Sequence, residues 1–320
     1  MKFDAPQFRD ETEARRYIEA LRWPGGRVCP KCGVIGAEYE TKREGRYRCG
    51  AKECRKDFTV TTGTVMEATH IKLTVWVMAF YLMASSKKGM SAHQLHRTLD
   101  VTYKSAWFLC HRIRLAMANG GLVGPLGGSG QVVEADETYF GRVSNPETRS
   151  RTTGQPYKNK KNQRGPANKR AVVALVERGG QARVFHVAEA DRVTVEKIVL
   201  KNVDPASRLH TDESNLYKRV GAEFASHESV KHTAGEYVRG DVHNNSAENF
   251  FSVFKRGMTG TYQHCDEKHL HRYVSEFEFR FNTRTKLGYT DTQRAQRAIE
   301  GAEGKRLTYR RTNEVEQQSV

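Results

Sequence analysis

Two pairs of cysteines constrain the fold of this 320-residue chain more than any other feature. Cys29 and Cys32 have two residues between them, Cys49 and Cys54 have four, and 16 residues separate the two pairs. Four thiolates at this spacing are typical of a tetrahedral zinc site in which each pair lies on a tight turn. Because four thiolates leave no open coordination position, the zinc ion would be structural. The spacing therefore predicts a zinc ribbon over residues 27–69.

Other interpretations of the cysteines remain open. The four thiols could be unrelated buried side chains, and a redox-active pair would explain the first spacing but not the second. Between the pairs, residues 38–41 and 46–48 have the pattern of short strands, which a ribbon requires. Cys110 and Cys265 are isolated in the sequence, and we expect them to be small buried apolar side chains.

The segments on either side of the predicted ribbon have helical patterns. Residues 1–26 contain a helix whose apolar side chains recur at helical spacing, and Asp10 with Glu13 forms a possible capping box. After the ribbon, residues 73–84 give a strongly apolar helix. We therefore expect residues 1–119 to contain several helices and one small metal-bound module.

Residues 70–119 carry the pattern of a helical DNA-binding domain. A helical segment at 91–99 is separated by a short turn from a second segment that begins near Thr102 with polar and basic residues. This arrangement predicts a helix-turn-helix, with Lys104 at the start of the second helix as a DNA contact. The alternative is an ordinary helical hairpin with a solvated basic face.

Residues 131–285 alternate between strand-like and helical patterns, which predicts an α/β domain. The Gly-rich residues 120–130 are expected to be a linker, and residues 286–320 a C-terminal helix and tail. Gly179-Gly180 predicts a hairpin. The expected elements are strands at 132–140, 169–178, 183–187, 207–212 and 227–232, and a helix at 193–200.

Three acidic residues of this domain have positions that suit metal chemistry. Asp136 lies in the middle of the first expected strand, Asp212 ends a later strand, and Glu248 lies on a following helix. Two Mg²⁺ ions about 3.5–4 Å apart can hold the attacking and leaving oxygens of a phosphodiester. Because Mg²⁺ prefers hard oxygen ligands and keeps several waters, a few carboxylates are sufficient.

Each of these acids has an alternative interpretation. Glu134 shares the strand face of the first aspartate and is its rival, whereas Glu137 points to the opposite face. Asp212 could simply form a turn. Asn245 could be a helix N-cap, with Glu248 as its capping-box partner.

The charge of the chain predicts a polyanionic partner. Lys and Arg number 53 against 37 Asp and Glu, which gives a formal net charge of +16. Residues 142–170 carry nine basic residues and one acid, and their Pro and Gly residues argue against regular structure. We expect this basic insert to bind DNA phosphates, unless it is only a solvated loop. The residues expected to bind phosphate are Lys158, Lys160, Lys161 and Arg164.

Nothing in the sequence predicts a membrane protein. The longest apolar stretch, residues 73–84, is too short to span a bilayer, and the first residues carry acids where a signal peptide needs an apolar core. We therefore expect a reducing, cytoplasmic compartment.

The acidic residues also resemble those of a known family. The order Asp136, Asp212, Glu248, with 35 residues between the last two and Lys255 seven residues after the glutamate, resembles the DDE transposases of bacterial insertion sequences. The wider sequence resembles the branch that carries an N-terminal zinc ribbon. The motifs that carry this resemblance are Arg22-Trp23-Pro24, Cys29-Pro30-Lys31-Cys32, Ala135-Asp136-Glu137-Thr138-Tyr139-Phe140-Gly141, His210-Thr211-Asp212-Glu213, Gly260-Thr261-Tyr262 and Phe279-Arg280-Phe281-Asn282-Thr283-Arg284.

The resemblance, which covers roughly residues 8–285, implies a multidomain α+β protein whose catalytic domain is ribonuclease H-like with a mixed sheet. It implies that Asp136, Asp212 and Glu248 bind two Mg²⁺ or Mn²⁺ ions, and that Lys255 and the neighbouring Arg256 contact DNA. The implied partners are the terminal repeats of the transposon and the target DNA. A homodimer or larger assembly on DNA, in the bacterial cytoplasm with the nucleoid, would join the two ends.

Three functions are consistent with these sequence features. A transposase would cut transposon ends with divalent metal ions and join the 3′-hydroxyl to target DNA. A regulator would bind DNA through the ribbon and the helix-turn-helix without catalysis, which would leave the three acids unexplained. A nuclease on the same fold would cut but not join.

Overall fold

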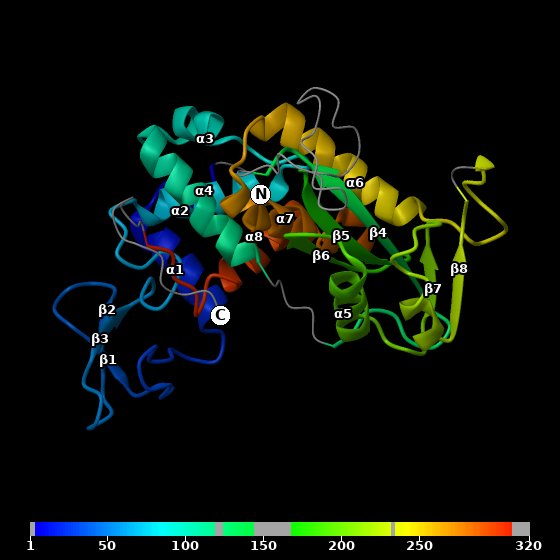
Figure 1. The fold of residues 1–320 in the computed structure, drawn as a ribbon. Coiled ribbons are helices and arrows are strands. Elements are labelled where there is room, and N and C mark those ends of the chain that lie inside the picture. The colour runs from blue at the N-terminus through cyan, green and yellow to red at the C-terminus, as the bar shows by residue number, and fades with distance from the viewer. Residues whose placement is uncertain (1–3, 119–123, 144–167, 232–233, 309–320) are drawn as a thin grey trace, which may run out of the picture. The chain divides into compact units, whose positions relative to one another are not determined.

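The computed structural model describes residues 4–118, 124–143, 168–231 and 234–308 (Figure 1). Contacts within the chain divide it into two compact units. The first unit combines Met1–Gly120 with Tyr289–Val320, and the second is Gly121–Gly288. The predicted N-terminal helix, ribbon and helical domain therefore belong to one compact unit, together with the C-terminal helix.

The ribbon of the first unit is a three-stranded antiparallel sheet. Its strands are β1 (Glu38–Glu40), β2 (Arg46–Cys49) and β3 (Asp57–Thr59), in the order β1-β2-β3. The two expected strands are present, whereas the three-residue β3 is an addition to them. Tyr47 and Phe58 pack their rings 5.7 Å apart, and Trp23 packs edge-on against both of them.

The helices of the first unit surround α2, none of whose residues is exposed, since six are buried and the other seven are half-buried. This explains its uniformly apolar sequence, since a helix that faces solvent on one side alternates with polar residues. Helices α1, α4 and α8 all pack against α2. The bounds are η1 (Pro6–Phe8), α1 (Glu11–Arg22), α2 (Leu73–Ser85), α3 (Ala92–Leu99), α4 (Tyr103–Met117) and α8 (Asp291–Glu300).

Side-chain caps fix the start of several of these helices. Asp10 accepts a hydrogen bond from the backbone N–H of Glu13 at 2.9 Å, but the N–H of Asp10 bonds to the Pro6 carbonyl, so the cap is present without the reciprocal bond of a capping box. Thr102 caps α4 in the same way, and α3 ends at Asp100 in the left-handed conformation, with φ of 49°. The two predicted helices at 91–99 and beyond Thr102 are therefore present, joined by a tight turn.

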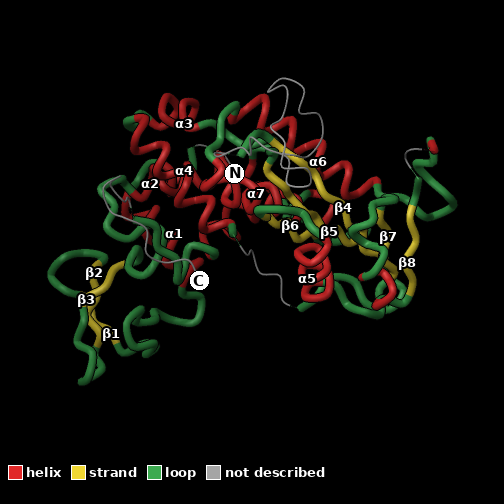
Figure 2. Tube along the Cα trace, viewed as in Figure 1, coloured by secondary structure: helices red, strands yellow, loops and turns green. Residues whose placement is uncertain are grey.

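The second unit is built on a mixed five-stranded sheet (Figure 2). The strand order is β6-β5-β4-β7-β8, in which β4, β5 and β6 are antiparallel neighbours and β7 and β8 run parallel to β4. This sheet confirms the predicted multidomain α+β class with a ribonuclease H-like domain. The strands are β4 (Val132–Phe140), β5 (Arg170–Glu177), β6 (Ala182–Val187), β7 (Arg208–Thr211) and β8 (Ser226–Ser229).

Helices cover both faces of this sheet. Val172, Ala174 and Val176 pack on one face with α6 and α7, whereas Val173 and Leu175 pack on the other with α5. Because both faces are buried, β5 is a continuous apolar run and does not alternate. The bounds are α5 (Arg192–Asn202), η2 (Val220–Glu223), α6 (Asn245–Gly257), the π-helical η4 (Met258–Tyr262), α7 (Glu267–Asn282) and η5 (Thr285–Leu287).

Helix α7 protects the exposed edge of the sheet. The Asn282 side chain accepts a hydrogen bond from the N–H of Ala182 at 2.7 Å and donates one to its carbonyl at 2.8 Å. The Glu278 carboxylate accepts the N–H of Val184 at 2.9 Å. These side chains replace the neighbouring strand that β6 lacks, which blocks edge-to-edge association. Asn282, part of the motif at 279–284, therefore has a structural role.

The second half of the predicted linker is part of the second unit. Leu126 is buried in the core beside α5, and its N–H bonds to the carbonyl of Asn202 at 2.8 Å. Gly127 approaches Ser207 so closely that a Cβ would lie 2.2 Å from the Ser207 hydroxyl. Within the expected linker 120–130, residues 126–128 therefore pack against the second unit. No helix in the described part of the chain is long and apolar enough to cross a membrane.

Candidate functional site

The sheet places two of the predicted catalytic acids side by side. Strands β4 and β7 run parallel with Glu134 opposite His210. Asp136 lies two residues further along β4, and Asp212 lies just past the end of β7, where its charge acts on Asp136. The Asp212 carboxylate lies just past the end of β7 and accepts the N–H of Ser214 at 3.0 Å. Asp212 therefore makes a turn-forming hydrogen bond through one of its two carboxylate oxygens.

Helix α6 brings the third acid to the same face of the sheet. Even-numbered residues of β4 face α6, and Glu248 lies in the first turn of that helix. Burial and the charges of Asp212, Glu137 and Glu248 raise the pKa of Asp136 to about 8. The charges of both other predicted carboxylates, and that of Glu137, therefore act on Asp136.

The chemistry of this site favours a bound cation. Converging carboxylates repel one another, and a divalent ion neutralises that repulsion. In the described residues, only the four cysteines bring three or more possible ligand atoms within 4.8 Å of one another. Asp136, Asp212 and Glu248 do not meet this distance criterion, and what links them is their electrostatic effect on Asp136.

The capping-box interpretation of Glu248 is wrong. Asn244 is the N-cap residue of helix α6, and its side chain makes no capping hydrogen bond. The Glu134 carboxylate serves instead, since one oxygen accepts the N–H of Ser246 at 2.6 Å and that of Ala247 at 3.2 Å. The sequence suggests Glu134 only as a rival of Asp136, whereas the structure gives it a separate structural role.

Glu137 lies on the opposite face, as the alternation of the strand predicts. Its carboxylate accepts a hydrogen bond from the buried Tyr217 hydroxyl at 2.7 Å. Burial raises the pKa of Glu137, and the charge of Asp212 adds to that effect. Glu137 is therefore near the site but belongs to the α5 side of the sheet.

Only some of the predicted DNA-binding residues lie in the part of the chain that the structure describes. Lys255 and Arg256 are exposed on α6, and Lys255 is two turns from Glu248, so the two side chains share one face of the helix. Lys104 is exposed at the start of α4, next to the exposed Tyr103. The other four expected residues lie outside the described residues: Lys158, Lys160, Lys161 and Arg164.

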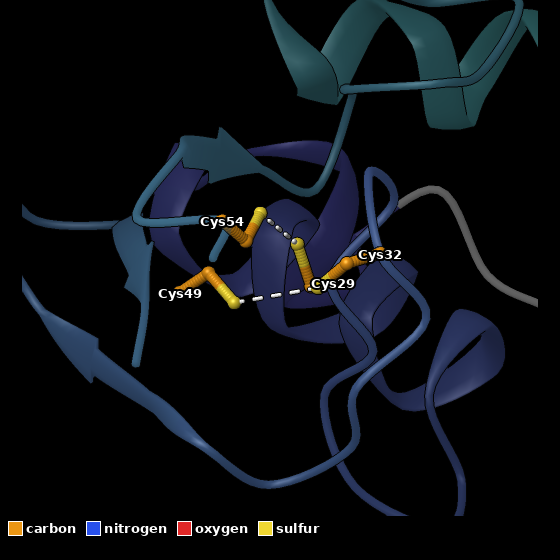
Figure 3. Close-up of side chains that lie close together, drawn as sticks. All are labelled: Cys29, Cys32, Cys49 and Cys54. Atoms are coloured by element: carbon orange, nitrogen blue, oxygen red, sulfur yellow. Dashed lines mark hydrogen bonds between the residues drawn. The ribbon is translucent and has the colours of Figure 1, made fainter. Parts of the chain in front are cut away.

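The four cysteines of the ribbon face one another (Figure 3). The sulfur atoms of Cys29 and Cys54 are 3.8 Å apart, and those of Cys32 and Cys49 are 3.6 Å apart. A tetrahedral zinc ion with Zn–S bonds of about 2.3 Å requires sulfur atoms about 3.8 Å apart. The geometry therefore fits the predicted zinc site.

The backbone around the sulfurs explains why the site forms. Gly33 follows the first pair with φ of +77°, a conformation that favours glycine. At Gly50, an added Cβ would lie 2.2 Å from the Ala37 carbonyl oxygen. Burial raises the pKa of the Cys29 thiol, but backbone N–H groups of Lys31 and Cys32 outweigh it and lower that pKa to about 7. Cys110 and Cys265 are buried, as expected.

Known protein families match both the ribbon region and the second unit of the chain. Residues 125–282 match the family of ISXO2-like transposase domains, and residues 9–57 match the transposase zinc-ribbon domain. An uncharacterized protein in transposable element ISH50 of Halobacterium salinarum is 30% identical over 291 residues, which are 85% of this chain and 91% of the relative. The solved Mos1 transposase paired-end complex with left transposon end aligns with 72% of this chain and 80% of its own at 10% identity, with a TM-score of 0.20, too low to establish a shared fold.

Proposed function

Because this chain belongs to the transposases that combine a zinc ribbon with an ISXO2-like transposase domain, we propose that it cuts transposon ends and joins them to target DNA. The observation that carries this proposal is the convergence of Asp136, Asp212 and Glu248 on one face of the mixed sheet. The three carboxylates would hold the divalent ions, Mg²⁺ or Mn²⁺. Two such ions, when bound, stabilise the attacking and leaving oxygens of a phosphodiester.

The residues of the chain have separate tasks in this proposal. Asp136 and Asp212 offer carboxylates from neighbouring strands, and Glu248 offers one from α6. Lys255, on the same face of α6 as Glu248, would bind the DNA backbone beside the cut and so fix the scissile phosphate. Water and then the 3′-hydroxyl act as nucleophiles, so no covalent bond between protein and DNA is formed.

DNA recognition would use the first unit and the net positive charge. The zinc ribbon and the turn between α3 and α4 would bind the terminal repeat, with Lys104 exposed where α4 begins. The excess of basic residues adds a sequence-independent attraction to phosphate. Joining two ends in one event requires at least a dimer on DNA, and the bacterial cytoplasm with its nucleoid is the place where such DNA is found.

A strand-transfer assay distinguishes this proposal from its two alternatives. The full chain is incubated with Mn²⁺, a labelled pre-cut end of its own transposon and a plasmid target. A transposase yields labelled joined product, and a nuclease yields cut DNA without joined product. A non-catalytic regulator yields neither, although it retards the labelled end in a gel, and either of the last two results would refute the proposal.

A further inference from the structure

A buried cluster of polar side chains lies next to the candidate site. It is called the Arg178 cluster here and consists of Glu134, Arg178, His210 and His243. Arg178 follows the end of β5 and is three-quarters buried, whereas Glu134 is fully buried. The Arg178 guanidinium donates to Glu134 Oε1 from Nε at 3.0 Å, and its Nη2 is 2.9 Å from the same oxygen. Nη2 also lies 3.3 Å from His210 Nδ1 and 3.2 Å from His243 Nδ1.

Two residues of the Arg178 cluster lie on the strands that lead to the predicted catalytic aspartates. Glu134 and His210 pair across β4 and β7, and each lies two residues before a predicted catalytic aspartate on its own strand. Side chains two positions apart in a strand share a face and are stacked along it. Asp136 therefore lies one step further along β4 than Glu134, and Asp212 lies just past the end of β7, two residues after His210.

The same cluster holds the N-terminus of α6. Glu134 accepts the N–H groups of Ser246 and Ala247 and the Ser246 hydroxyl. Arg178 donates to the carbonyl of Asp241 at 2.8 Å and to that of His243 at 3.1 Å, so it also holds the segment that leads into the helix. A carboxylate at this end of a helix is further stabilised by the helix dipole.

We infer that Glu134 and Arg178 are positioning residues that set the place of Glu248 relative to Asp136 and Asp212. Glu248 lies one residue after Ala247, whose N–H is bonded to Glu134. Any shift of the helix N-terminus therefore moves Glu248 directly. This inference rests on the proposed function, because it assumes that Glu248 is a metal ligand.

The test measures the affinity of the full-length, zinc-loaded protein for Mn²⁺ alone, by isothermal titration calorimetry. Four variants are compared with the natural chain: Glu134→Gln, Arg178→Met, Glu248→Gln and the double variant Glu134→Gln/Glu248→Gln. A matched control is Glu276→Gln, because Glu276 is as fully buried as Glu134 and pairs with Arg280 on α7, away from the site. Thermal unfolding identifies the temperature at which every variant is folded.

Substitution of residues that orient metal ligands typically weakens metal binding by about 10- to 100-fold, and we expect this for Glu134→Gln and Arg178→Met. In the Glu248→Gln background, Glu134→Gln should change the affinity by no more than about twofold, since it acts through the residue already removed. Glu276→Gln should lower stability without changing the affinity for Mn²⁺. If Glu134→Gln does not fold, the test uses Arg178→Met instead, because the Arg178 side chain is partly exposed.

Each contrary outcome has a distinct meaning. If Glu248→Gln weakens Mn²⁺ binding but Glu134→Gln and Arg178→Met do not, the inference is wrong and the carboxylate site stands. Full additivity in the double variant would also overturn it, because Glu134 would then act independently of Glu248. If Glu248→Gln itself leaves Mn²⁺ binding unchanged, the assignment of the carboxylate site and this inference both fail.

Discussion

Glu278 on α7 should make the second unit less stable as pH rises. Its carboxylate accepts the N–H of Val184, yet burial raises its pKa from 4.5 to about 7, against the opposing effects of that bond and of Arg183. Below pH 4.5 the carboxyl group is protonated in the folded and the unfolded chain, so it has no effect on stability. Between pH 4.5 and 7 the folded chain binds more protons, and stability falls until the loss is complete above pH 7.

The size of this loss follows from the shift in pKa. A difference of about 2.5 pH units at about 1.4 kcal/mol per unit gives about 3 kcal/mol at pH 8. Glu278→Gln removes the charge but keeps an oxygen that can accept the Val184 N–H. We therefore expect the variant to be more stable than the natural chain by up to about 3 kcal/mol at pH 8, with the difference much smaller at pH 4.5.

Urea unfolding followed by circular dichroism, at pH 4.5 and pH 8, measures this difference. The matched control is Glu223→Gln, because Glu223 is an exposed acid of the same unit and should have little effect at either pH. A Glu278→Gln variant with the same difference from the natural chain at both pH values would refute the reasoning, since a charge effect must disappear when the carboxyl group is protonated.

Three further predictions concern zinc and DNA. Atomic absorption should find about one zinc ion per chain, and Cys32→Ser should abolish zinc binding and unfold the ribbon while the second unit stays folded; zinc-free protein purified under reducing conditions without chelator would contradict this. Gly50→Ala should weaken zinc binding because its Cβ would lie 2.2 Å from the Ala37 carbonyl oxygen, whereas Gly25→Ala, with no atom within 4 Å, should not; equal effects would count against the knuckle geometry. Deleting residues 146–164 should flatten the salt dependence of DNA binding by about 0.9 log unit per log unit of salt for each phosphate that the shortened protein no longer neutralises, and an unchanged slope would show that the insert is only solvated.

Local patterns were sufficient to predict most elements of the second unit. Strand β4 has the predicted bounds, because its β-branched and aromatic residues are interrupted neither by Gly nor by Pro. Strand β3 (Asp57–Thr59), by contrast, was not predicted, although it is no shorter than the predicted β1 (Glu38–Glu40). It exists because β2 pairs with it between the second cysteine pair and the helical domain.

Long-range contacts explain what the sequence could not indicate. Glu134 caps a helix that begins 111 residues later, and its spacing from Asp136 indicates only the shared strand face. The packing of α8 against α2 likewise joins segments that are more than 200 residues apart. For the candidate site, the order of the acids predicted Asp136, Asp212 and Glu248, whereas the bonds of Glu134 and Arg178 to the start of α6 and the segment before it became apparent only from the fold.

The most direct test of the carboxylate site compares Asp136→Asn, Asp212→Asn and Glu248→Gln in the strand-transfer assay. Each change keeps the size of the side chain but removes the negative charge that would hold a divalent ion. We expect all three to abolish joining of the pre-cut end, and cutting of an uncut labelled end tested in parallel, while the variants still bind the end, because binding depends on basic residues and the first unit. Glu223→Gln should retain activity. A Glu248→Gln protein that still forms joined product would contradict the proposed triad, since the third ligand would then lie elsewhere.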